Sequence, residues 1–159
     1  MENTKNYLLV LEESLKKKIT ILNELVSLTN VQKDIVMKEQ FDDEAFNTNV
    51  EQKAALINEL EKLDRGFQIL YDNVKAQIEG NKKLYKEDIQ RLQEDITLVM
   101  DKSASLMVME SKNKELIKSR FSSLKKEARQ MKKSRELAAS YYKTMNNISS
   151  EPYFLDRKK

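Results

Sequence analysis

Cysteine and histidine are both absent from this chain of 159 residues, which also contains only two glycines and one proline. Without cysteine the chain can form neither disulfides nor thiolate metal sites, and without histidine it lacks the commonest general base and metal ligand. The shortage of glycine and proline removes most of the turn signals that a sheet-based fold requires. We therefore expect an all-α protein that is not an enzyme and has no catalytic residues, metal site or cofactor.

Long hydrophobic runs are missing as well. The longest extend over about four residues, as in LMVM (106–109). A membrane-spanning helix needs about 20 apolar residues, so no membrane span is expected. The N-terminal MENTKNY also lacks the basic and apolar regions of a signal peptide. The expected location is the cytoplasm.

Charged residues are abundant, at 35% of the chain, and their signs are unevenly distributed. Residues 1–113 contain 16 Lys/Arg and 21 Asp/Glu, a net charge of −5, whereas residues 114–159 contain 13 and 5, a net charge of +8. Cations surround the segment 118–143 instead of forming one stripe, and Glu127 and Glu136 are interleaved with them. We therefore favour binding of an apolar partner helix, with or without acidic residues, over binding of nucleic acid or a membrane surface.

Apolar residues recur at spacings of three and four along most of the chain, which predicts amphipathic helices. The first helix is expected over residues 4–38. Asp42 is the predicted N-cap of a second helix over 43–78, with Phe41 and Phe46 as a hydrophobic staple across its start. The first two helices are expected to form an antiparallel hairpin.

The two glycines have different predicted roles in the second helix. Gly66 lies inside it, at a cost of roughly 1 kcal/mol relative to alanine, and indicates close packing or a slight bend. Gly80 is expected in the left-handed conformation that often ends a helix.

A third helix is expected over residues 83–147, because no glycine or proline interrupts that segment. At 1.5 Å per residue it would extend about 90 Å, against about 50 Å for each of the first two helices. Its apolar stripe is interrupted at Ser103, Glu110 and Asn113, which we interpret as the boundary between a tight bundle and a mobile arm. The apolar face of that arm can bend back, dimerise or bind another protein.

The last segment, EPYFLDRKK (151–159), differs from the helical sequence before it. Pro152 lacks a backbone N–H and disfavours a helical conformation of the residue that precedes it. Tyr153 and Phe154 are therefore expected on an extended tail, which we interpret as a short docking motif that folds back over the arm or contacts a partner. Residues 1–150 would form a single helical domain.

Three segments occur in a recognisable order along the chain. NVEQKAALINELEKLD (49–64) follows an acidic turn with phenylalanine and aspartate, ESKNKELI (110–117) lies in the third helix, and YYKTMNNISSEPYFLDRKK (141–159) closes the chain. Together they resemble the FlgN-type flagellar export chaperones. The resemblance implies an antiparallel three-helix arrangement with a long C-terminal helix. It also implies a cytoplasmic chaperone that binds the C-terminal helical region of hook-associated (hook–filament junction) proteins, prevents their aggregation and delivers them to the flagellar type III export gate.

The resemblance places partner binding in the C-terminal region and associates a tyrosine there with docking to the export gate, for which Tyr141 and Tyr142 are both candidates. The alternative is a structural coiled-coil protein that self-associates as a homodimer through the long C-terminal helix. The predicted partner-binding residues are Leu116, Ile117, Phe121, Leu124, Met131, Tyr141, Tyr142, Met145, Tyr153 and Phe154.

Overall fold

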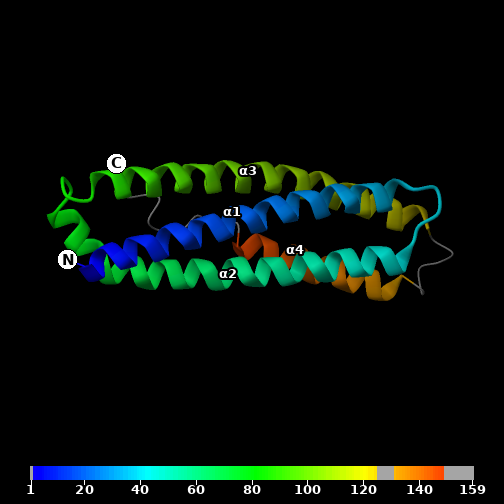
Figure 1. Cartoon of the computed structure of the whole chain (residues 1–159). Helices are drawn as coiled ribbons and strands as arrows, with labels where there is room; N and C mark the ends of the chain where they lie inside the picture. The colour runs from blue at the N-terminus through cyan, green and yellow to red at the C-terminus, as the bar shows by residue number, and fades with distance from the viewer. Residues whose placement is uncertain (1, 125–130, 149–159) are drawn as a thin grey trace.

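The structure is a computed structural model that describes residues 2–124 and 131–148, with side chains for residues 3–124 and 131–146. These residues form four helices and no strand: α1 (Glu2–Met37), α2 (Asp43–Gly80), α3 (Lys86–Ser123) and α4 (Lys132–Ile148). Figure 1 shows an elongated bundle in which each helix runs opposite to the one before it. The prediction of an all-α fold is confirmed.

The turn between α1 and α2 forms as the sequence predicts. The Asp42 carboxylate accepts a hydrogen bond from the Ala45 amide at 3.0 Å, which satisfies one of the free N–H groups at the start of α2. The rings of Phe41 and Phe46 lie 5.4 Å apart. Phe121, near the end of α3, packs edge-on against both rings at 5.8 and 5.6 Å. These aromatic contacts fix the end of α3 beside the α1–α2 turn.

The end of α2 differs from the sequence prediction. Gly80 is the last residue of the helix and has no positive φ, so the predicted left-handed conformation is wrong. Asn81 ends the helix instead, because its backbone N–H donates to Ile78 O at 3.2 Å and its side chain donates to Gln77 O at 2.9 Å. Asn81 thereby satisfies carbonyl groups at the end of α2, which was the role expected of Gly80.

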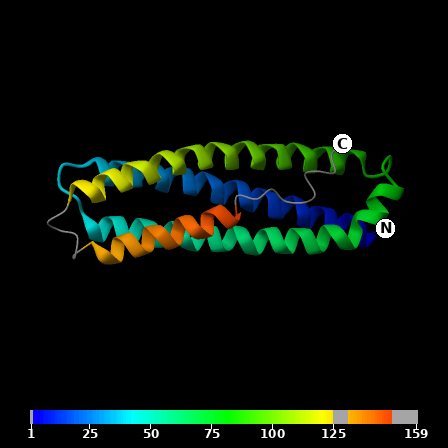
Figure 2. The same cartoon turned by 180° about the vertical axis from the view of Figure 1, so that it is seen from behind.

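The single helix expected over residues 83–147 is not formed, and this prediction is corrected. Helix α3 ends at Ser123, and α4 runs back in the opposite direction beside α2, as Figure 2 shows from behind. The reason is burial. A straight continuation would leave Met131, Tyr141, Tyr142 and Met145 in water, whereas all four are buried in the folded chain.

The lengths of the helices fit this reversal. Helices α1, α2 and α3 have 36, 38 and 38 residues, so α3 stops where its partners stop. The sequence contains a weak sign of the end in the adjacent Ser122 and Ser123, which are poor helix-interior residues. Buried apolar residues from all four helices form one core, with α1 packed against α2 and α3, and α4 packed against α2.

Candidate functional site

A lysine and a glutamate are buried together in the middle of the bundle. Lys53 of α2 and Glu110 of α3 are 0% and 1% exposed, and Lys53 Nζ lies 2.6 Å from Glu110 Oε1. Both residues occupy positions on the apolar stripes of their helices. Because a buried charge is costly without a partner, each side chain stabilises the other in this position.

Polar residues of α1 and α3 complete the surroundings of this ion pair. The side-chain oxygen of Gln32 accepts hydrogen bonds from Lys53 Nζ at 3.1 Å and from Asn113 Nδ2 at 2.9 Å. Asn113 Nδ2 also donates to the backbone oxygen of Thr29 at 2.8 Å. Three helices therefore meet in one hydrogen-bonded layer, and a shift of any helix by one turn would break several of these bonds at once.

Helix α4 joins the layer through two tyrosines. The Tyr141 hydroxyl donates to Glu110 Oε2, and the Lys53 ammonium lies 4.5 Å from the centre of the Tyr141 ring. The Tyr142 hydroxyl lies 3.5 Å from the side-chain oxygen of Gln32, and the two tyrosine rings meet edge-on at 5.1 Å. The layer thus attaches α4 to a defined position on the other helices. We call Gln32, Lys53, Glu110, Asn113, Tyr141 and Tyr142 the polar layer.

Burial alters the ionisation of three members of the polar layer. It lowers the pKa of Lys53, an effect that the neighbouring Glu110 carboxylate opposes. Burial raises the pKa of Tyr141 and Tyr142 well above their ordinary range, and the negative charge of Glu110 adds to the increase. Both phenols therefore stay protonated near neutral pH, as their role as hydrogen-bond donors requires. The polar layer joins all four helices through side-chain hydrogen bonds.

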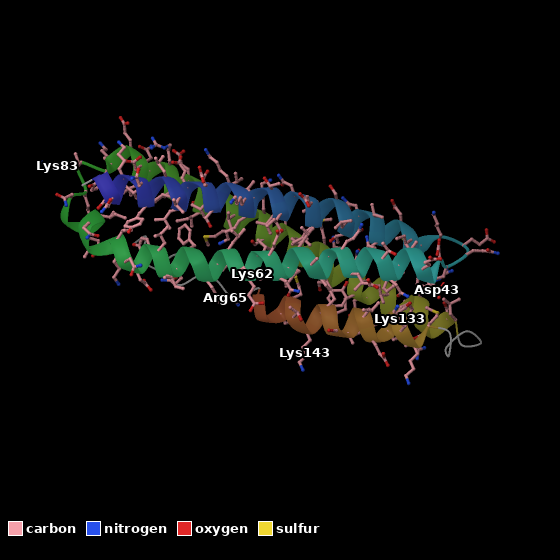
Figure 3. The ribbon with its side chains drawn as sticks, turned by 60° about the horizontal axis from the view of Figure 1, so that its bottom comes forward. Asp43, Lys62, Arg65, Lys83, Lys133 and Lys143 are labelled. Atoms are coloured by element: carbon pink, nitrogen blue, oxygen red, sulfur yellow. The ribbon has the colours of Figure 1, made fainter. Side chains whose placement is uncertain are left out.

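A groove of about 430 Å³ lies between α3 and α4, beside the polar layer. Its floor is apolar and aromatic, and its rims are basic. The floor consists of Ile117, Phe121, Ala138 and Tyr142. The rims contain Lys114 and Lys118 on α3 and Arg135 and Lys143 on α4. Figure 3 shows Lys143 extending from α4 away from the bundle. We call this feature the α3–α4 groove.

The structure brings together only part of the predicted partner-binding set. Ile117, Phe121 and Tyr142 line the α3–α4 groove. Tyr153 and Phe154, with the rest of the tail at 151–159, lie outside the described residues. Met131, Tyr141 and Met145 are buried in the core, and Leu116 and Leu124 are half-buried against it. The premise that this stripe lies beyond the reach of the first two helices is wrong, because α4 packs against α2.

Sequence reasoning missed the polar layer and the basic rims of the groove. A signal for the layer was present, since Lys53 lies on the apolar stripe of one predicted helix and Glu110 on that of another. Opposite charges at such positions indicate a buried pair. The interruption of the apolar stripe, which predicts a boundary between a tight bundle and a mobile arm, includes Glu110 and Asn113. In the structure they lie within its most highly connected polar cluster.

Comparison with protein-family models, with curated protein sequences and with solved structures gives no match for this chain. Among the helices of residues 2–124 and 131–148, none is long and apolar enough to cross a membrane.

Proposed function

We propose that this protein is a cytoplasmic export chaperone that holds a helical segment of its cargo in the α3–α4 groove. The observation on which the proposal depends is the groove itself, a trough between two helices with an apolar, aromatic floor. Such a trough suits the apolar face of one amphipathic helix. In line with the sequence resemblance, the proposed cargo is the C-terminal helical region of a hook–filament junction protein, delivered to the flagellar export gate.

The expected affinity suits a carrier that must also release its cargo. Two or three large apolar side chains buried in the groove would contribute roughly 1.5–3 kcal/mol each. Ordering of the cargo helix and loss of its free motion offset part of this gain. The net gain is then at most about 5 kcal/mol, which corresponds to a dissociation constant of roughly 0.2 mM or weaker before the rim charges are counted. No nucleotide is needed for binding or release at this strength.

Docking at the export gate through Tyr141 or Tyr142 stays part of the proposal. Both rings are buried, at 2% and 8% exposure, and the Tyr141 hydroxyl is bonded to Glu110. A gate protein can therefore contact either ring fully only after α4 moves away from α2. On this basis the gate-bound form is proposed to have α4 detached, and the cargo-holding form to have α4 in place.

The structural coiled-coil alternative needs an apolar stripe that is left unpaired within one chain. Outside the α3–α4 groove, the described part of the stripe is mostly covered by the chain's own helices, with Met131 and Met145 both buried. This burial favours the chaperone proposal over self-association through a long helix.

The proposal is tested by calorimetric titration of the full-length protein with a C-terminal helical peptide of a junction protein, with light scattering to give the stoichiometry. A one-to-one complex is expected. Ala139→Trp should fill the α3–α4 groove and abolish binding, because Ala139 is exposed and lines it. Ser140→Trp is the matched control, since the adjacent Ser140 lines a different groove, between α2 and α4. A stable homodimer that ignores the peptide would refute the proposal.

A further inference from the structure

The rims of the α3–α4 groove are basic. Of its ten lining residues four are Lys or Arg and none is acidic. Lys114 and Lys118 are one helical turn apart on α3, and Arg135 and Lys143 lie two turns apart on α4. Cations are thus present along both sides of an apolar floor.

These cations have little compensation among the described residues. Among residues 3–124 and 131–146, Arg135 and Lys143 form no ion pair with an acidic side chain. Lys118 makes one contact, at 3.7 Å, with Glu115, and both side chains are largely exposed, so this pair contributes little. Lys114 lies 6.0 Å from the centre of the Tyr142 ring, which forms part of the floor. The positive charges on the rims are therefore mostly available to interact with a ligand.

A second groove of the same bundle has the opposite charge, and a third mixes Lys16, Lys17 and Lys62 with Glu24 and Glu59. The groove between α1 and α2 has a similar volume, about 420 Å³, but its lining contains Asp42 and Glu44 and no Lys or Arg. Grooves between helices of this protein are therefore not basic in general. Two grooves of one size and opposite charge would select different partners.

We propose, building on the proposed function, that the α3–α4 groove selects an acidic amphipathic helix whose apolar stripe is flanked on both sides by Asp or Glu. The apolar stripe would lie on Phe121 and Tyr142, with carboxylates facing the rim cations. The chain's own tail is a poor occupant, because EPYFLDRKK ends in three cations. Phosphates of nucleic acid or lipid would also pair with the rims, and the test below includes both as competing ligands.

The expected effect is moderate in affinity and large in salt dependence. An exposed ion pair changes affinity by about two- to fivefold, and four such pairs together by about tenfold or more. Rim charges also speed association, and this increase falls steeply as ionic strength rises. Selection of acidic flanks should therefore be clear at low salt and nearly absent at high salt.

The test uses the full-length protein and three synthetic helical peptides that share one apolar stripe and differ only in their flanks, which are Glu, Gln or Lys. At about 50 mM salt we expect affinity to fall in that order, with about tenfold or more between the Glu and Lys peptides, and to converge near 1 M salt. The double variant R135E/K143E should abolish the order, because two cations and two carboxylates then line the groove. The matched control K132E/K133E changes the same net charge on exposed lysines of α4 outside the groove lining and should keep the order.

The outcomes separate this inference from the proposed function. If the three peptides bind equally at low salt and Ala139→Trp still abolishes binding, the acidic-flank inference is overturned and the chaperone function stands. Failure of all three peptides to bind counts against the chaperone function and the inference together. Single-stranded DNA or anionic vesicles that bind in preference to the Glu peptide would overturn the inference if R135E/K143E abolishes their binding. A homodimer that R135E/K143E dissociates would also overturn it, since a second copy would then occupy the groove.

Discussion

Helix α3 packs against α1 along a mainly apolar seam and has 38 residues, whereas α4 has only 17, packs against α2 and depends on a buried tyrosine hydroxyl. An isolated helix as short as α4 is only marginally stable in water, so its structure depends on tertiary contacts. Helix α3 contributes to the main core, while α4 covers one side of it. The two helices therefore differ in how much their structure depends on the rest of the bundle.

Detachment of α4 would leave a nearly complete bundle behind. Helices α1, α2 and α3 keep the packing between α1 and each of its two neighbours. Lys53 and Glu110 would become accessible to water, where charged groups are well solvated. Local opening of α4 should therefore need less free energy than global unfolding, and the cargo and gate steps proposed above require such a difference.

The largest effect is expected from Lys53→Met. This change leaves Glu110 buried without its cationic partner and should reduce the free energy of unfolding by about 3–5 kcal/mol. Urea denaturation followed by circular dichroism measures the loss. The double variant Lys53→Met/Glu110→Leu is the control and should recover most of the stability. If the double variant is no more stable than the single one, the layer is not held together by this pair.

Tyr141→Phe should destabilise the attachment of α4 to the bundle and leave the stability of α3 unchanged. The variant keeps the ring but removes the hydrogen bond to the charged Glu110, at an expected cost of about 1.5–3 kcal/mol. In hydrogen exchange, amides of α4 should lose protection while those of α1 and α3 keep it. Equal loss in all four helices would show that α4 does not open independently.

Alkaline pH provides a third test, because burial raises the pKa of Tyr141 and Tyr142 above the ordinary value of 10.0. The folded protein then binds more protons than the unfolded chain above about pH 10. The tyrosine contribution to stability is full below that pH and is lost as pH rises, by up to about 1.4 kcal/mol per pH unit for each tyrosine. The lowered pKa of Lys53 acts in the opposite direction, adding stability only up to the ordinary lysine value of 10.5.

The measurement is the melting temperature between about pH 10.5 and 12, where the effect of Lys53 has ended. The wild-type protein should lose stability more steeply than Tyr141→Phe/Tyr142→Phe, which has no phenol at either position. Parallel curves for the two proteins would mean that the tyrosines are accessible to water in the folded state.

The smallest effect is expected from Gly66→Ala. Gly66 is exposed within α2, and nothing lies within 4 Å of the position that a β-carbon would occupy, so close packing does not explain this glycine. Alanine should stabilise the helix by up to about 1 kcal/mol. The residue lies beyond Asn58 of the α2–α4 groove, so global stability should rise while exchange in α4 stays the same. A change in α4 exchange would show coupling along the whole of α2.

The helical class and the local features that depend on near neighbours could be predicted from the sequence. The 3–4 spacing of apolar residues, the Asp42 cap and the Phe41–Phe46 contact involve residues a few positions apart, and all of them are present in the structure. The end of the third predicted helix, the contact between Lys53 and Glu110 and the set of cations that line the α3–α4 groove depend on how the helices pack. These features join residues as far apart as Gln32 and Tyr142, and their energy comes from burial and charge pairing that only the packed helices provide.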